Sequence, residues 1–93
     1  ETFALDELLP SAEAGPEAVF VRRILIEEIE AALDELPSEQ RDVFVAHEIE
    51  GRGFKELAAG TGVSVNTLLS RKHYAVIHLR KRLRDIYDEF NKE

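Results

Sequence analysis

The sequence predicts an all-α fold, a four-helix domain with a C-terminal helix-turn-helix. Apolar residues recur at three- and four-residue spacing along most of the chain, which is the pattern of amphipathic helices. Proline or glycine interrupts this pattern at Pro37, at 51–53 and at 60–62, so four helical segments are separated. No segment shows the alternating pattern of a β-strand.

The first helix is expected from Pro16 to Leu36. Proline suits a first helical turn because its missing N–H would have no partner there, and Pro37 pushes the residue before it out of the helical conformation. The apolar residues of this helix are Val19, Phe20, Ile24, Leu25, Ile29, Ala32, Leu33 and Leu36. Residues 1–16 are expected to form an acidic linker or arm, with room for one short helical turn before Pro10, and residues 17–91 the helical domain.

Two shorter helices follow. Ser38 is expected to be the N-cap of the second helix, which runs to about Glu48. The residues that this helix is expected to bury are Val43, Phe44 and Ile49. The third helix runs from Phe54 to about Ala59, and the glycines of 60–62 end it because glycine adopts a left-handed conformation at low cost.

The fourth helix is expected to follow Ser64, a second N-cap, and to run from Val65 to about Phe90. At the standard helical rise, about 26 residues span about 40 Å. The apolar stripe of this helix is Leu68, Ala75, Val76, Leu79, Leu83, Ile86 and Phe90.

Charge is distributed unevenly along the chain. The net charge is -7, but residues 1–50 carry fourteen acidic and three basic residues, whereas residues 51–93 carry five acidic and nine basic ones. Affinity for DNA depends on Lys and Arg contacts to phosphates, so a DNA-binding face is expected in the second half. The chain has no cysteine, no long apolar run and no secretory leader pattern, which predicts a soluble cytoplasmic protein without membrane insertion. It has no methionine and is expected to be part of a longer protein.

Residues 54–71 have the features that a helix-turn-helix requires. Ala58 allows two helices to cross closely, the glycines permit a sharp turn, and Val63 and Leu68 fill the angle between the helices. In such a motif the N-terminal residues of the second helix meet base edges in the major groove. The residues expected to point outward there are Asn66, Thr67, Ser70, Arg71 and His73.

Three linked motifs support a family resemblance. They read LDELPSEQRDVF at 33–44, EGRGFKELA at 50–58 and GVSVNTLLSR at 62–71. In order and spacing they resemble region 4 of bacterial sigma factors of the extracytoplasmic-function (ECF) type, over about residues 17–86. The resemblance implies a winged-helix-like arrangement without a wing, binding of the minus-35 promoter element, docking on the flap of core RNA polymerase, and an anti-sigma factor as partner.

The resemblance also implies roles for single residues. Ser70 and Arg71 match the Ser-Arg pair that faces the groove, and Thr67 matches a residue that meets phosphate. The predicted DNA-binding residues are Arg71, Ser70, Thr67, Asn66, His73, Lys72 and Lys55.

The sequence departs from the family pattern at three positions. Leu69 and Tyr74 stand where basic residues are common, and Lys72 stands where an apolar core residue is usual, so Leu69 and Lys72 look exchanged. An apolar Leu69 can contact a thymine methyl group. The basic run Arg80, Lys81, Arg82 and Arg84 fits either phosphate contacts or a solvated face, because a helix spreads these residues around its axis.

No pattern indicates catalysis or a metal site. His47, His73 and His78 have no ligand spacing on a helix, so no metal and no cofactor are expected. The glutamates of 27–30 have no accompanying nucleophile or phosphate-binding loop, so an enzyme is not expected.

Two other hypotheses about the function stay open. In the first, the same fold serves mainly as a protein-interaction module for an anti-sigma factor or a polymerase subunit, which the acidic first half and the loss of basic groups at Leu69 and Tyr74 favour. In the second, the helix-turn-helix is of the response-regulator type, but the LPSEQR motif and the long basic last helix favour the sigma-like reading.

Overall fold

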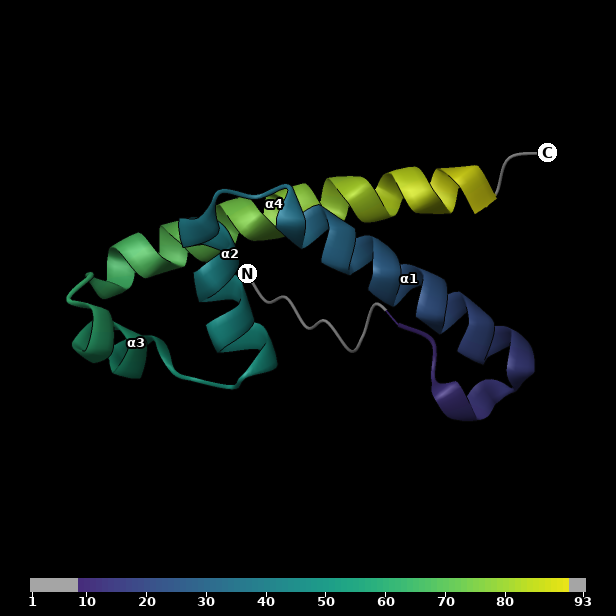
Figure 1. Ribbon diagram of the computed structural model, residues 1–93, viewed down its shortest axis with the longest axis horizontal. Coiled ribbons are helices and arrows are strands. Elements are labelled where there is room, and N and C mark those ends of the chain that lie inside the picture. The colour runs from purple at the N-terminus through teal and green to yellow at the C-terminus, as the bar shows by residue number, and fades with distance from the viewer. Residues whose placement is uncertain (1–8, 91–93) are drawn as a thin grey trace.

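The computed structural model describes residues 9–90, and within them it contains helices and no strand (Figure 1). The elements are a 3₁₀ turn η2 (Ala12–Ala14), α1 (Pro16–Asp34), α2 (Ser38–Phe44), a π-helical turn η3 (Val45–Ile49), α3 (Phe54–Thr61) and α4 (Val65–Phe90). The prediction of an all-α fold with four α-helices is therefore confirmed. The expected turn before Pro10 falls mostly on residues outside the described ones, as does the side chain of Phe90.

The two long helices, α1 and α4, pack against each other and enclose the main core together with α2. In Figure 1, α1 and α4 diverge toward the N-terminal end of α1, while α3 lies beside the start of α4 at the opposite end of the molecule. The main core therefore lies where the long helices approach each other, and the helix-turn-helix lies at one end.

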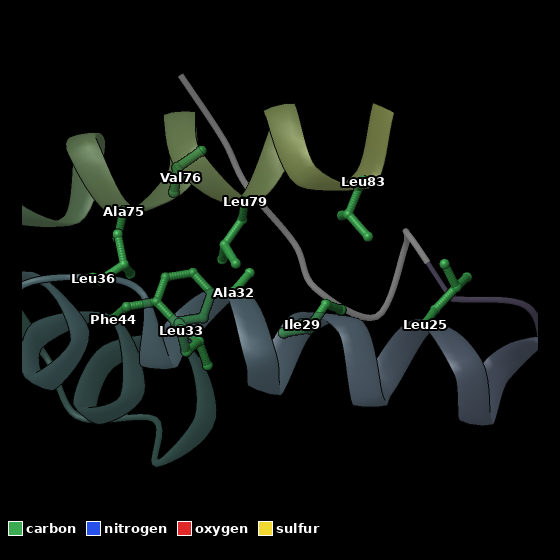
Figure 2. Packing of buried hydrophobic residues seen from close by; sticks show 10 residues of the cluster. All are labelled: Leu25, Ile29, Ala32, Leu33, Leu36, Phe44, Ala75, Val76, Leu79 and Leu83. Atoms are coloured by element: carbon green, nitrogen blue, oxygen red, sulfur yellow. The ribbon is translucent and has the colours of Figure 1, made fainter. Parts of the chain in front are cut away.

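Ten buried residues form the main core (Figure 2). They are Leu25, Ile29, Ala32, Leu33, Leu36, Phe44, Ala75, Val76, Leu79 and Leu83. Leu79 and Leu83 point from α4 toward α1, and the ring of Phe44 from α2 closes one end of this layer. The α1–α4 contact is therefore the apolar seam predicted from the helical spacing of both segments.

The N-terminal part of α1 leaves apolar side chains exposed. Val19 and Phe20 follow the helical spacing of the apolar residues, yet they are 39% and 60% exposed. Both residues belong to the first turns of α1, where α1 has already diverged from α4 (Figure 1), so α4 does not cover them. Helical spacing identified the apolar face correctly and did not show where the partner helix ends.

The start and the end of the second helical segment also differ from the prediction. Pro37 takes the N-cap position and Ser38 is the first helical residue, because the carbonyl of Pro37 accepts the amides of Gln40 and Arg41 at 3.0 and 3.1 Å. The side chain of Ser38 makes no capping hydrogen bond. Ile49, expected to be buried, is 55% exposed because it is the last residue of η3, where the chain leaves the packed helices.

The turn between α3 and α4 is built as predicted, with α3 two residues longer than expected. Gly62, at φ +75°, ends α3 and its amide donates to the carbonyl of Ala58 at 2.9 Å. The Thr61 hydroxyl donates to the carbonyl of Leu57 at 2.7 Å and accepts the amide of Val63 at 3.2 Å. These local bonds fix the sharp change of direction that a helix-turn-helix needs.

A second apolar cluster holds the helix-turn-helix together. Val43, Leu57 and Leu68 are its buried members, one each from α2, α3 and α4. The partly buried residues packed against it are Ala46, Phe54, Ala58 and Val63. The predicted roles of Ala58, Val63 and Leu68 in filling the angle between the helices are therefore confirmed.

Candidate nucleic-acid interface

The exposed residues of the first three turns of α4 form one surface, here called the outward face. It consists of Asn66, Thr67, Leu69, Ser70, His73 and Tyr74, all of which are exposed. Ser64 Oγ accepts the amide of Thr67 at 3.2 Å and donates to the Thr67 hydroxyl at 3.0 Å, so the predicted N-cap is confirmed and the first turn is held in place. Four of the seven predicted DNA-binding residues, Asn66, Thr67, Ser70 and His73, lie together on this face.

The charge of α4 suits a polyanion. From Val65 to Arg84 the helix carries six basic residues and no acidic one. The opposite half of the chain holds most of the carboxylates. A duplex that approached the outward face would meet hydroxyl, amide and imidazole groups without an acidic side chain of α4 among them.

Arg71 lies at the edge of the outward face, turned toward α2. Its Nη2 atom lies 2.9 Å from Oε2 of Glu39, and its side chain is 29% exposed. Glu39 is in the first turn of α2 and was not among the predicted site residues. The guanidinium of Arg71 is therefore engaged within the domain, although it remains accessible to solvent.

Lys72 does not join the outward face. Its Nζ atom lies 2.7 Å from Oε1 of Glu48 and 2.6 Å from Nδ1 of His47, and the side chains of Lys72 and Glu48 are only 12% and 14% exposed. The His47 ring stacks on Phe54 with centroids 4.0 Å apart. The apparent exchange of Leu69 and Lys72 is thus matched by Glu48 and His47, which give the inward-turned ammonium two polar partners.

Lys72 also determines the protonation state of the His47 ring. An ammonium group has no lone pair, so Nδ1 of His47 must be the acceptor and the ring is neutral. Desolvation of the ring, followed by the positive charge of Lys72, lowers the pKa of His47 from its ordinary value, with Glu48 opposing the shift. Residue spacing in the sequence could not predict the contacts among His47, Glu48, Phe54 and Lys72, because these residues come from η3, α3 and α4.

The remaining predicted residues are divided between elements. Lys55 is exposed in the first turn of α3, on the scaffold helix. In the basic run, Arg82 binds Glu35 at 3.1 Å and lies 3.8 Å from Glu28, so it faces α1. Lys81 and Arg84 are exposed. The basic run is therefore split between a contact with α1 and the solvent-facing side of α4.

Glu35 joins the end of α1 to α4. One of its carboxylate oxygens, Oε1, lies 2.8 Å from Nε2 of His78 and 3.1 Å from Nε of Arg82. The hydrogen bond from His78, and then that from Arg82, lower the pKa of Glu35 from its ordinary value. These contacts orient the C-terminal half of α4 against α1.

An open hollow of about 570 Å³ lies between α2, α3 and α4, beside Arg71. Its charged lining is balanced between three acidic and three basic residues: Glu39, Asp42, Glu50, Arg41, Arg52 and Arg71.

Among the described residues, no group of three or more His, Cys, Asp or Glu side chains could hold a metal ion. Over the same residues, no helix combines the length and the apolar character needed to span a bilayer.

Comparison with known proteins agrees with this geometry. The family model described as sigma-70, region 4 matches residues 26–86, which include the C-terminal part of α1, all of α2 and α3, the turn between α3 and α4, and most of α4. The chain is 34% identical over 85 residues to the ECF RNA polymerase sigma factor SigE of Mycolicibacterium smegmatis. This alignment covers 91% of the chain and 32% of the relative, so the chain spans about a third of the length of that protein. No solved structure matches the chain significantly. The helix-turn-helix, the three motifs that build it and the family match together show that the chain belongs to the sigma-70 region 4 family.

Proposed function

We propose that this chain is the domain of an ECF sigma factor that recognises the minus-35 promoter element and so directs RNA polymerase to initiate transcription. The observation that carries the proposal is the outward face, where hydrogen-bonding side chains cluster on the first turns of a helix that follows a tight turn and carries no acidic residue before Asp85. In a helix-turn-helix, this is the part of the second helix that enters the major groove. The domain acts by binding.

Each part of the site has a role in this proposal. Ser70 and Asn66 read base edges, and Thr67, at the capped start of α4, contacts the backbone. Arg71 reads a base after exchanging Glu39 for DNA, and Lys55 on α3 contacts a phosphate. Residues 17–91 form the binding domain, and residues 1–16 form the acidic linker that joins it to the rest of the sigma factor.

The proposed partners are promoter DNA, the flap of core RNA polymerase and an anti-sigma factor. The exposed apolar residues Val19 and Phe20 on α1 support protein contacts. We propose that the domain acts in the cytoplasm.

Selection from random duplexes tests the proposal. The chain, and the sigma factor that contains it bound to core polymerase, are each used to enrich duplexes, and binding of the enriched duplex is measured across a salt series. We expect one sequence to be enriched and log K to fall with log[salt] with a slope of about -3 or steeper, as three or more phosphate contacts require.

A second candidate function is a protein-interaction module that keeps the fold. The observation that favours it is that Arg71 and Lys72, two of the basic residues nearest the outward face, are engaged by carboxylates of the domain itself. This candidate predicts no enriched duplex and a shallow salt dependence, so the same experiment separates the two.

A further inference from the structure

The outward face contains one side chain that cannot form a hydrogen bond. Leu69 is 45% exposed and stands three residues after Asn66 and four before His73, so these three side chains line one side of α4. Ser70 is exposed directly beside it. An apolar side chain therefore lies among the groups that the proposed function assigns to base reading.

Lys72, the basic residue three positions after Leu69, is turned into the domain. Lys72 is held by Glu48 at 2.7 Å and by His47 at 2.6 Å, with its side chain only 12% exposed. Its ammonium is therefore not available above Leu69 to bind guanine or phosphate. At this turn of the helix, the surface offered to a ligand is the isobutyl group of Leu69.

The surroundings of Leu69 select a nucleic-acid ligand. The helix is free of acidic residues from Val65 to Arg84, Arg71 is partly exposed beside the outward face, and Lys81 and Arg84 are exposed further along, so α4 presents basic groups and no acidic one to a phosphate backbone over this length. On the base edges of the major groove, the apolar group that distinguishes one base pair from the others is the 5-methyl of thymine.

We infer that Leu69 is a specificity-determining residue that contacts the 5-methyl group of a thymine in the recognised duplex. This inference rests on the proposed function and adds to it a base preference. The neighbouring Asn66 and Ser70 contact polar edges of adjacent bases, while Leu69 excludes water from the methyl group. The recognised element therefore contains a thymine at the step that faces the second turn of α4.

Replacing thymine by deoxyuridine tests the inference, because this substitution removes the methyl group and keeps every hydrogen-bonding group. The probe is the duplex enriched by selection, with its thymines replaced one at a time, and the protein is the same form that enriched it. At one position we expect about fourfold weaker binding, the loss that follows from removing one buried methyl-sized group.

Variants connect this effect to Leu69. Leu69→Ala is expected to bind the thymine and deoxyuridine duplexes equally at that position, and Leu69→Met, which keeps an apolar side chain of similar size, is expected to retain most of the discrimination. Ile77→Ala is the matched control, since Ile77 is also exposed, at 49%, two turns further along α4. It should keep the discrimination at this position. Helical circular dichroism should be unchanged in all three variants because both side chains are exposed.

The failure of the inference and the failure of the proposed function differ in this experiment. If a sequence is enriched but every deoxyuridine duplex binds as well as its thymine parent, or if Leu69→Ala keeps the discrimination, the role of Leu69 is refuted and promoter binding stands. If neither form of the protein enriches a sequence, the proposed function fails and this inference fails with it.

Discussion

Arg71 and Lys72 are adjacent basic residues that the fold treats differently. The ion pair of Arg71 with Glu39 is solvent-accessible, with Arg71 29% and Glu39 66% exposed, and exposed pairs of this kind contribute about 0–1 kcal/mol. Arg71 can therefore exchange Glu39 for DNA at little cost. The contact of Lys72 with Glu48 is largely enclosed, at 12% and 14% exposure, so separating this pair leaves two poorly solvated charges.

For Arg71, substitution by alanine is expected to weaken specific DNA binding by about 1–3 kcal/mol if the arginine contacts a guanine with two hydrogen bonds. Glu39→Gln should strengthen binding by about twofold to fivefold, because it removes a competing carboxylate. A double-mutant cycle measured by fluorescence anisotropy isolates the coupling between the two. An equal gain in the Arg71→Ala background would show that Glu39 acts through the general electrostatic field and not through Arg71.

His47 predicts a pH dependence of stability. Because its pKa is lowered in the folded domain, the unfolded chain binds more protons at mildly acidic pH. The contribution of neutral His47 to stability is therefore complete above its ordinary pKa of 6.5 and is lost as the pH falls from there toward the lowered value. Urea unfolding at pH 7.5 and 5.5 should show a smaller loss of the unfolding free energy in His47→Asn than in the unsubstituted chain.

His73→Asn is the control for this measurement, since His73 is exposed on the outward face. It should leave the difference between the two pH values close to that of the unsubstituted chain. A pH difference unchanged by His47→Asn would contradict the role assigned to the His47–Lys72 contact.

At the scale of elements, the turn between α3 and α4 depends on one backbone conformation. Gly62 lies at φ +75°, whereas Gly60, two residues earlier, lies inside α3. A Cβ atom at Gly62 would meet nothing within 4 Å, so the cost of a side chain there comes from the backbone alone. The two glycines therefore respond to the same substitution in opposite directions.

Gly62→Ala is expected to destabilise the domain by about 1–2 kcal/mol, the cost of a left-handed conformation for a residue with a Cβ atom. Gly60→Ala is its matched control and should stabilise the domain by about 0.5–1 kcal/mol, because alanine is favoured over glycine in a helical conformation and its Cβ would meet only Arg52 Nη2 at 4.0 Å. Chemical denaturation followed by circular dichroism measures both. Changes of the same sign would contradict the assigned helix end.

Capping of α4 is also a property of a single element. Ser64 Oγ accepts the amide of Thr67, which would otherwise lack a partner in the first turn. Ser64→Ala is expected to reduce the unfolding free energy by about 0.5–2 kcal/mol. Ser38→Ala is the comparison, and it should change stability much less, because Ser38 makes no capping hydrogen bond.

At the scale of the whole molecule, α2 connects the two apolar clusters through adjacent residues. Phe44 belongs to the main core between α1 and α4, whereas Val43 belongs to the cluster that holds the helix-turn-helix. The binding motif is therefore packed on the same short helix that closes the main core. We expect the two clusters to unfold together.

Leu79→Ala tests this coupling. Leu79 is fully buried between α1 and α4, so its truncation should cost about 2–5 kcal/mol, while Ile77→Ala on the exposed side should cost little. Amide hydrogen exchange should then show faster exchange in α3 as well as in α1. Loss of protection confined to α1 and the second half of α4 would show that the helix-turn-helix folds independently.

The sequence alone determined the helices, the turns between them and most of the outward face. These features depend on contacts within three or four residues, such as the Ser64 cap and the Gly62 stop, and on the helical spacing of apolar residues. For this reason, the positions of Asn66, Thr67, Ser70 and His73 on α4 were predicted correctly. Nothing beyond local hydrogen bonding and periodicity was needed.

The tertiary structure alone decided which basic residues remain on the surface for a ligand. Arg71 meets Glu39 and Lys72 meets Glu48 and His47, and these partners lie on helices that are distant in sequence. The exposure of Val19, Phe20 and Ile49 likewise depends on where the neighbouring helices end. The sequence pattern shows that a residue is basic or apolar, but the packing of α2 and η3 against α4 determines whether a carboxylate lies beside it. That packing turns Lys72 inward and leaves Leu69 exposed on the outward face.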